Sequence, residues 1–214
     1  MAKTFDITPI KDHVVFTDNG RCILLDTGCP YIITEENKHS IPGGARFLDS
    51  VKDDVASDIV EFRGMQYFER HKVLLDISNK KLVVADPDEP LSVDSPVAEF
   101  GVEYTRGRIM FDLNVGGSDR KMIFDTGASI TDYMSAAIAR TGTYFDTIED
   151  FNPFLGKFKV DRYKLPVKVG TDTFDIPFGE LPAPVGADGV IGVGLYKRYK
   201  VLFDIPGKKL VLGR

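Results

Sequence analysis

Hydrophobic residues along this chain of 214 residues fall mainly into short runs, some of which alternate with polar residues. Runs such as "RCILL" (21–25), "KVLL" (72–75) and "KMIF" (121–124) are apolar at nearly every position. Turn-forming pairs, for example Pro206-Gly207, separate one run from the next. Short apolar or alternating runs between turn signals are typical of β-strands. The pattern therefore predicts a mainly β protein.

Two segments depart from that pattern. Residues 131–142 (TDYMSAAIARTG) are rich in alanine, can be capped by Thr131 or Asp132 and can end at Gly142, which predicts a helix. Residues 85–96 (ADPDEPLSVDSP) carry three prolines and four acidic residues, which favours a linker. We therefore expect an N-terminal half over residues 1–88, a linker over 89–97 and a C-terminal half over 98–214.

The two halves share a closing segment. Residues 63–85 (RGMQYFERHKVLLDISNKKLVVA) align without a gap with residues 191–213 (IGVGLYKRYKVLFDIPGKKLVLG), at a constant offset of 128 residues. An apolar run followed by Asp-Thr-Gly also occurs twice, as "RCILLDTGCP" (21–30) and "RKMIFDTGAS" (120–129). Self-similarity of this kind indicates an internal duplication.

The duplicated aspartates, Asp26 and Asp125, are candidates for one shared site. Two similar halves can pack about a two-fold axis, as the subunits of a dimer do, and the same residue of each half then meets its counterpart. Two adjacent carboxylates do not both ionise readily, so one keeps a proton while the other does not. This provides an acid and a base around one water molecule. The alternative, two turn aspartates with local hydrogen bonds, does not explain the duplicated context.

The residues that follow each aspartate suit such a pair. Gly28 and Gly127 have no Cβ, which lets two turns approach each other closely. The hydroxyl groups of Thr27 and Thr126 can hydrogen-bond to the backbone of the opposite turn. We therefore expect these four residues to support the carboxylate pair.

Two apolar residues followed by Asp-Thr-Gly are the signature of the aspartic peptidases, and "ADGVIGVGLYKRYKVLFDIPGKKLVLG" (187–213) is similar to the closing segment of that family. Each half resembles a retroviral-type (retropepsin) subunit in length, so the chain resembles a single-chain, fused-dimer retropepsin. The resemblance implies an all-β, closed-barrel-like aspartic protease fold, with two homologous halves related by a pseudo-two-fold axis and few short helices. It also implies an aspartic endopeptidase with Asp26 and Asp125 as catalytic residues, no metal or other cofactor, and an extended peptide or protein substrate.

The first half departs from the family's pattern. Cys29 and Pro30 follow its Asp-Thr-Gly where small or hydroxyl residues are usual, and Arg63 stands where the second half has Ile191. A charge in the segment that crosses behind the catalytic loop is unexpected, and we expect it to point outward. These differences leave a second hypothesis, a catalytically weak or inactive peptide-binding module with the same cleft.

The second half contains a long insertion. From the aspartate to the matched glycine of the closing segment, the first half has 38 residues and the second has 67. The insertion includes residues 143–165 (TYFDTIEDFNPFLGKFKVDRYKL), which predict one hairpin flap over the cleft, with a turn at Asn152-Pro153. The corresponding first-half segment, residues 40–48, is too short for a flap. The candidate cleft and flap residues are Phe151, Phe154, Leu155 and Gly156.

Composition and charge narrow the classes of partner. The chain is 43% hydrophobic and 28% charged, which is typical of a soluble globular protein. Its net charge of −5 and isoelectric point of about 5.3 argue against binding to nucleic acid or to an anionic membrane. The N-terminal sequence "MAKTFDITPI" lacks the apolar stretch of a signal peptide, and no N-glycosylation sequon occurs. We therefore expect a cytoplasmic monomer.

Neither the histidines nor the cysteines suggest a metal site. His13, His39 and His71 show no ligand spacing, and we interpret them as surface or ordinary packing residues. Cys22 and Cys29 are too few for a disulfide framework or a zinc quartet, and we expect free thiols.

Overall fold

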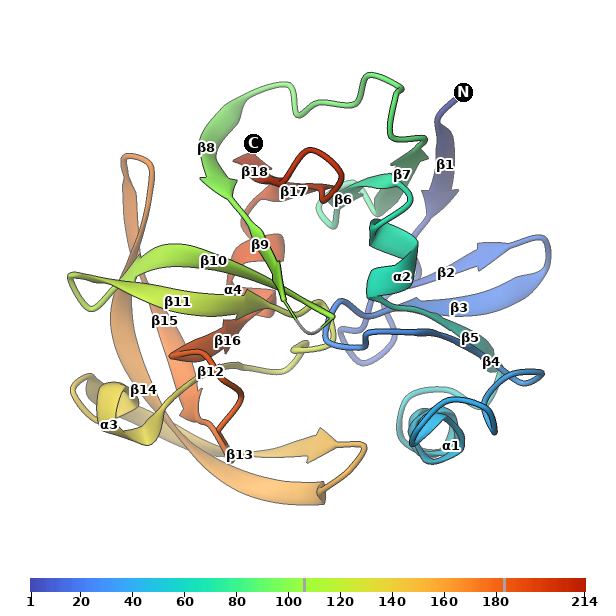
Figure 1. The fold of residues 1–214 in the computed structure, drawn as a ribbon. Helices are drawn as coiled ribbons and strands as arrows, with labels where there is room; N and C mark the ends of the chain where they lie inside the picture. Colours follow the sequence, from blue (N-terminus) through green and yellow to red (C-terminus); the bar gives the residue numbers. More distant parts are fainter. Residues whose placement is uncertain (106, 183) are drawn as a thin grey trace.

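The computed structural model describes residues 1–214 except residues 106 and 183, and it is mostly β (Figure 1). This confirms the predicted all-β class with few helices. The helices are α1 (Gly44–Asp54), α2 (Met65–Phe68), α3 (Ala136–Ala139) and α4 (Val193–Tyr196). None of the helices in the described parts of the chain is long and apolar enough to cross a membrane.

The strands follow one another along the chain in short antiparallel and parallel pairs. The strands up to residue 85 are β1 (Lys3–Asp6), β2 (Val15–Asp18), β3 (Arg21–Leu25), β4 (Ile32–Thr34), β5 (Ile59–Arg63), β6 (Lys72–Asp76) and β7 (Lys81–Ala85). The later strands are β8 (Pro96–Gly101), β9 (Glu103–Thr105), β10 (Arg108–Val115), β11 (Ser118–Phe124), β12 (Asp132–Met134), β13 (Thr143–Asn152), β14 (Gly156–Val169), β15 (Asp172–Glu180), β16 (Gly189–Ile191), β17 (Lys200–Asp204) and β18 (Lys209–Gly213).

One arrangement of four strands occurs twice. In the first half β2 pairs antiparallel with β3, β3 pairs parallel with β5, and β5 pairs antiparallel with β4. In the second half β10, β11, β16 and β12 make the same three kinds of pair in the same order. The closing segments also match, since α2, β6 and β7 correspond to α4, β17 and β18 at the offset of 128 residues, as with Lys72 and Lys200. The duplication in the sequence therefore extends to the elements and their pairing.

The second half closes on itself through one more pairing. Strand β14 pairs with β15 from Arg162 to Val169, and Val167 of β14 also lies opposite Val115 of β10. This links β14, β15, β12, β16, β11 and β10 into a ring, whereas the first-half sheet has the open order β2-β3-β5-β4. The two halves therefore share a central arrangement but differ around it.

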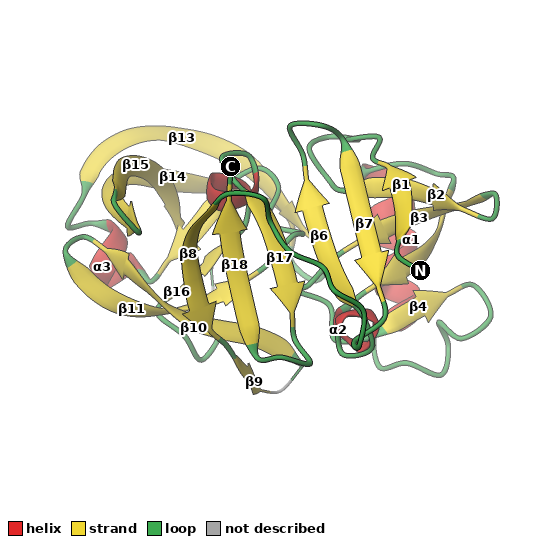
Figure 2. Ribbon diagram, turned by 90° about the horizontal axis from the view of Figure 1, so that it is seen from above, coloured by secondary structure: helices red, strands yellow, loops and turns green. Residues whose placement is uncertain are grey.

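A six-stranded sheet joins the halves, with the order β1-β7-β6-β17-β18-β8 (Figure 2). At its centre β6 of the first half pairs antiparallel with β17 of the second, with Leu74 opposite Leu202. Strand β8, which begins at Pro96 inside the segment predicted as a linker, forms one edge of this sheet. Backbone hydrogen bonds thus tie the two halves together on the side away from β13.

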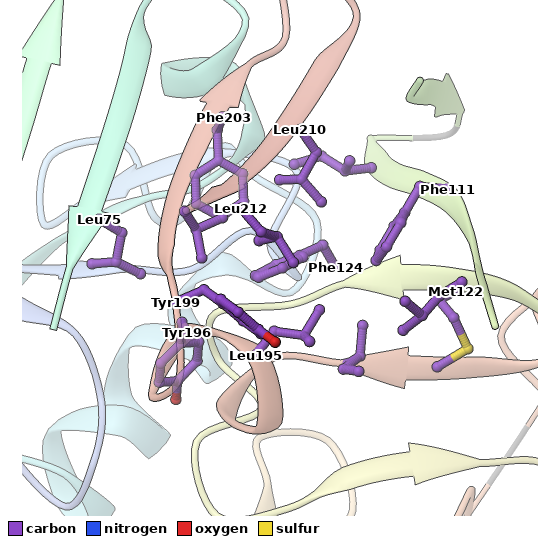
Figure 3. Close-up of a cluster of buried hydrophobic side chains, with 14 of the residues drawn as sticks. Leu75, Phe111, Met122, Phe124, Leu195, Tyr196, Tyr199, Phe203, Leu210 and Leu212 are labelled. Carbon is purple, nitrogen blue, oxygen red and sulfur yellow. The ribbon is translucent and has the colours of Figure 1, made fainter. Parts of the chain in front are cut away.

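Buried side chains beneath this sheet come from both halves (Figure 3). Phe203 of β17 packs edge-to-face on Phe124 of β11 and on Phe68 of α2, with ring centroids 5.0 and 5.1 Å apart. Leu75 of β6 belongs to the same cluster. A fully buried side chain of this size contributes about 1.5–3 kcal/mol. Because Phe124 directly precedes Asp125, this core fixes the end of the strand that carries the second aspartate.

The predicted helix over residues 131–142 is wrong for most of its length. Residues Asp132–Met134 form strand β12, and only Ala136–Ala139 form a helix, α3. Tyr133 lies opposite Val190 of β16 on one side and Gly179 of β15 on the other, which holds the segment extended. Pairing on both sides overrides the weak local preference of an alanine-containing segment for helix.

Helix α1, Gly44–Asp54, was not predicted. Its Leu48 and Val51 are buried against the first-half sheet, and Phe47 packs on Phe62 of β5 with ring centroids 4.8 Å apart. The helix lies between β4 and β5 in the chain, which is where the second half has β13, β14 and β15 between β12 and β16. The first half therefore has a helix where the second half has a long hairpin.

Candidate active site

Asp26 and Asp125 occupy equivalent positions in the two repeated sheets. Asp26 directly follows β3 and Asp125 directly follows β11. The N–H of Asp26 donates to the carbonyl oxygen of Arg63 at 3.1 Å, and the N–H of Asp125 donates to that of Ile191 at 2.8 Å. Each aspartate is thus held at the end of a buried strand by the crossing strand beside it.

Thr27 and Thr126 exchange four hydrogen bonds between the two halves. The hydroxyl of Thr126 accepts from the N–H of Thr27 at 3.0 Å and donates to the carbonyl of Leu25 at 3.0 Å. The hydroxyl of Thr27 accepts from the N–H of Thr126 at 2.9 Å and donates to the carbonyl of Phe124 at 2.9 Å. Both threonines are 0% exposed. The structure thus brings the two predicted threonines together and joins the two aspartate turns through them.

The glycines place each turn against the carboxylate of the other half. A Cβ on Gly28 would overlap the carboxylate of Asp125, and one on Gly127 would lie 2.8 Å from Asp26 Oδ1. The N–H of Gly28 donates to Asp26 Oδ1 at 2.8 Å, and the N–H of Gly127 donates to Asp125 Oδ1 at 2.7 Å. The two carboxylates therefore meet where the halves touch, at a spacing that only glycine allows.

The two carboxyl groups have raised pKa values. Burial raises the pKa of Asp26, whose residue is 8% exposed, and the neighbouring charge of Asp125 raises it further. Burial also raises the pKa of Asp125, while the N–H of Gly127 opposes this shift by stabilising the ionised form. The pair therefore retains one proton over a pH range that extends above that of an ordinary carboxylic acid.

Asp132 is a buried acid next to this pair that was predicted only as a possible helix cap. Its Oδ1 accepts from the N–H of Gly192 at 2.6 Å and its Oδ2 from the N–H of Gly194 at 2.9 Å. Burial outweighs these two bonds and raises its pKa to about 7. Asp132 thus anchors the start of α4 behind Asp125, a role for which the local sequence carries no signal.

His13 links the halves at the edge of the site. Its Nε2 lies 3.3 Å from the hydroxyl of Ser129, four residues after Asp125. Burial lowers the pKa of His13 to about 4, so the ring is neutral near pH 7. The interpretation of His13 as an ordinary packing residue did not anticipate this contact.

The prediction that Arg63 points outward is wrong. Its side chain is only 12% exposed and forms ion pairs with Asp18 at 2.7 Å and Glu61 at 2.8 Å. The guanidinium also lies over the ring of Tyr67, 4.8 Å from its centroid. Partners from β2, β5 and α2 therefore compensate the charge that replaces Ile191 in the first half.

The two cysteines are free thiols, as predicted. Cys29 is buried beside the first aspartate, and burial raises the pKa of its thiol to about 12. A thiol with such a pKa stays protonated near neutral pH and is a poor nucleophile. Cys29 therefore acts here as a small apolar residue.

The predicted flap segment is a hairpin of β13 and β14. Asn152 pairs with Gly156 at its end, and residues 153–155 form the turn. Gly156 has a left-handed backbone, with φ of 77°, which a glycine adopts at no steric cost. Phe154 and Leu155 lie at the tip and are 51% and 57% exposed. In Figure 1 the hairpin reaches from the second half below the central loops toward α1.

One face of the hairpin contacts the strand that follows the second aspartate turn. The hydroxyl of Tyr133, in the strand that follows the second aspartate turn, donates to the carboxylate of Asp150 on β13. Asp150 lies opposite Phe158, and Ile148 lies opposite Val160. Because side chains alternate along a strand, these four residues share one face. Phe151, a predicted cleft residue, lies on the opposite face of β13.

The tip of the hairpin rests on α1 of the other half. Arg46 Nη2 donates to the carbonyl of Phe154 at 2.8 Å, and Ser50 Oγ donates to that of Pro153 at 3.5 Å. The rings of Phe47 and Phe154 lie 5.9 Å apart. Helix α1 thus receives a hairpin that bridges the two halves.

Comparison with solved structures finds matches to this chain. No protein-family model matches the chain, and no curated protein matches it in sequence. The crystal structure of basic 7S globulin from soybean is similar over 73% of this chain and 57% of its own, with a TM-score of 0.42 and 7% identity. The chain thus spans little more than half of that protein, and a likeness at this level carries no argument about function.

The threonine exchange predicts a large and non-additive stability effect. Thr126→Val leaves the buried N–H of Thr27 and a buried carbonyl without a partner, at about 1–3 kcal/mol each. We expect urea unfolding to report a free energy lower by about 2–4 kcal/mol, and Thr27→Val to behave alike. The double variant should lose less than the sum, because both residues share the same bonds. Thr173→Val, at an exposed position on β15, is the control. Additive losses, or losses no larger than in the control, would contradict a shared network.

The contact between the hairpin tip and α1 predicts a change in local opening. Removing the guanidinium in Arg46→Ala, or the ring in Phe154→Ala, takes away contacts that hold the tip down. We expect amide hydrogen exchange of a peptide covering residues 150–158 to become roughly tenfold faster, with little change in melting temperature, because such local opening precedes global unfolding. Lys159→Ala, at an exposed position on the same hairpin, should leave exchange unchanged. Equal exchange in all variants would show that α1 does not restrain the tip.

Proposed function

We propose that this chain is an aspartic endopeptidase built from two fused retropepsin-like halves, residues 1–88 and 98–214. The proposal is supported mainly by the buried hydrogen bonds that Thr27 and Thr126 exchange between the two halves. These bonds hold the turns of Asp26 and Asp125 next to each other. An aspartate that only stabilises its own turn needs no counterpart in the other half, whereas an acid–base pair needs one carboxyl group from each half. Since one chain supplies both carboxylates, the site is complete in a monomer.

The surroundings of the two carboxyl groups favour distinct roles. The charge of Asp125 adds to burial in raising the pKa of Asp26, while the N–H groups of Gly28 and Cys29 oppose this shift. The N–H of Gly127 supports the ionised form of Asp125. Asp125 is the less buried of the two residues, so we assign it as the base and Asp26 as the acid when the substrate binds.

The reaction then proceeds by two linked proton transfers. Asp125 takes a proton from the water molecule as its oxygen attacks the peptide carbonyl carbon, and Asp26 gives its proton to the carbonyl oxygen. The resulting tetrahedral diol collapses when Asp125 gives the proton to the amide nitrogen and Asp26 takes one back from a hydroxyl group. The C–N bond breaks, and one carboxylic acid and one amine leave. No metal or organic cofactor takes part.

The substrate is an extended peptide that lies between the hairpin and the aspartates. An extended segment can pair with a strand of the hairpin as an added strand. Ile148 and Phe158 are partly exposed on the hairpin face that carries Asp150, which favours apolar side chains near the bond that is cleaved. The docking of the tip on α1 requires the hairpin to lift before a folded or long substrate enters.

Substituting either aspartate tests the proposal. Asp26→Asn and Asp125→Asn should each reduce turnover of a diverse peptide mixture at least about a thousandfold while the far-UV spectrum stays native. The double variant should lose no more than either single one, since both act as a unit. New peptide termini are detected by mass spectrometry between pH 4 and 8. Near-normal cleavage by Asp26→Asn would overturn the mechanism, and saturable peptide binding without cleavage by wild type would support the non-catalytic module.

The pH dependence offers a separate test. The residues after the two Asp-Thr-Gly sequences, Cys29 and Ala128, supply no hydroxyl to the ionised pair. Burial has already raised the pKa values of the pair, so the acid limb of kcat/KM should lie nearer to neutral than a free carboxyl group would place it. Ala128→Ser adds a hydrogen bond to the charged form, which lowers the pKa and moves the acid limb downward. Ala128→Val is the control, and an unchanged or upward-moving limb in Ala128→Ser would contradict this explanation.

A further inference from the structure

Two backbone N–H groups that follow strand β5 are satisfied by backbone carbonyls in the first half. The N–H of Gly64 donates to the carbonyl oxygen of Tyr31, and the N–H of Gln66 donates to that of Pro30, each at 3.1 Å. Both acceptors belong to the segment that follows Asp26. Because neither acceptor is ionisable, these two bonds do not depend on pH.

In the second half one carboxylate takes the place of both carbonyls. The equivalent residues, at the offset of 128, are Gly192 and Gly194, and their N–H groups donate to Oδ1 and Oδ2 of Asp132 at 2.6 and 2.9 Å. Strand β12 begins with Asp132, whereas β4 of the first half begins with Ile32. A Cβ on Gly194 would lie 2.2 Å from Oδ2 of Asp132, so glycine makes room for the carboxylate. The two halves thus solve the same backbone problem with different groups.

The N–H groups that Asp132 holds belong to a segment that contacts the turn of Asp125. The carbonyl of Ile191 accepts from the N–H of Asp125 at 2.8 Å, and the N–H of Val193 donates to the carbonyl of Ala128 at 3.0 Å. The backbone carbonyl of Asp125 lies where a Cβ on residue 192 would be, only 2.0 Å from that position. A shift of this segment therefore moves the second aspartate turn.

Unlike a carbonyl, this carboxylate can change its charge. Asp132 is 1% exposed, and burial raises its pKa to about 7 against the opposing effect of the N–H groups of Gly192 and Gly194, while the charge of Asp125 adds to the rise. The ionised form accepts at both oxygens, whereas one oxygen of the protonated form is a donor, so one N–H loses its acceptor. Asp132 is therefore protonated below about pH 7 and fully able to hold both N–H groups only above it. A buried ionisable group costs free energy that a carbonyl does not, which makes a functional role plausible on physical grounds.

Other charged or ionisable groups face Asp132 from the elements around it. They are Asp125 on the aspartate turn, Tyr133 on β12, Arg162 on β14, Tyr196 on α4, and Lys197 and Arg198 after α4. Burial raises the pKa of both tyrosines, so neither titrates near neutral pH. Asp125 is itself part of a titrating pair, and a test of Asp132 has to separate the two by substitution.

We propose that Asp132 is a positioning residue for Asp125, and that the second aspartate turn keeps its geometry only while the Asp132 carboxylate is ionised. The first turn, held by carbonyls, has no such requirement. The consequence for cleavage rests on the proposed peptidase function, whereas the effect on the turn does not. Activity therefore depends on a third carboxylate that touches neither the substrate nor the attacking water.

Nuclear magnetic resonance of the isotope-labelled protein tests the turn without any substrate. Between about pH 5 and 9, the amide signals of Gly192 and Gly194 should shift together with one midpoint near pH 7, because their acceptor changes its charge. The amide signals of Gly64 and Gln66 are the matched controls in the same molecule and should not follow this midpoint. The comparison of the two halves needs no variant, so it stands even if a substitution at Asp132 prevents folding.

Two variants assign the titration to its group. Asp132→Asn should abolish the shift, since the amide side chain does not ionise. Asp125→Asn should retain it with a lower midpoint, because a facing negative charge is removed. The positioning role is overturned if the signals of Gly192 and Gly194 do not titrate, if both halves titrate alike, or if the shift survives Asp132→Asn and disappears in Asp125→Asn.

Turnover measures the consequence for the proposed reaction. Misplacing a catalytic group costs rate, so kcat/KM of wild type should exceed that of Asp132→Asn about tenfold at pH 8 and be roughly equal to it at pH 5, where Asp132 is protonated. Asp175→Asn, the same substitution at an exposed position on β15, should match wild type at every pH. A ratio that does not vary with pH would indicate a merely structural residue and overturn the proposal. Absence of cleavage by wild type would overturn the peptidase alone, since the amide titration decides the role of Asp132 independently.

Discussion

The arrangement of this molecule depends on the exchange of hydrogen bonds between Thr27 and Thr126. Each hydroxyl satisfies a backbone N–H and a backbone carbonyl of the opposite turn, in a position that water does not reach. If the turns shifted relative to each other, buried polar groups would lose their partners at a cost of several kcal/mol. The exchange therefore forms as a whole or not at all, and it sets the spacing of the two carboxylates as a consequence.

Around this symmetric centre the two halves have diverged. The first half has an open four-stranded sheet covered by α1, which is anchored through Leu48 and Val51. The second half has the hairpin of β13 and β14 in the same place along the chain. Helix α1 packs on its own cluster of buried residues, and Arg46 of this helix holds the tip of the hairpin. The halves therefore meet at the hairpin tip as well as at the aspartate turns.

The sequence predicted the features that local pattern and duplication determine. The β class, the repeat, the paired Asp-Thr-Gly turns and a hairpin after the second of them all follow from short stretches of chain. The errors come from partners that are distant in sequence. The segment around Asp132 is extended because it pairs with β15 and β16, which lie far along the chain. Arg63 is buried because Asp18 compensates its charge. Helix α1 begins after Gly43, whose backbone is left-handed and which provides no side-chain cap. The pair Gly43-Gly44 therefore predicts a turn in the sequence, not the start of a helix.

The asymmetry also bears on the chemistry that we propose. Two equivalent carboxylates that share one proton must become unequal, and their surroundings decide how. Asp26 is the more buried of the two residues, whereas Asp125 belongs to the half that carries the hairpin. The charge of Asp125 also raises the pKa of Tyr133, whose hydroxyl donates to Asp150 of the hairpin. An open hairpin admits water to Asp125 and lowers the cost of its charge, while a closed hairpin removes that water. In the mechanism that we propose, closure of the hairpin on a substrate would raise the energy of the ionised carboxylate when it must accept a proton from the attacking water, which would couple the hairpin to the base.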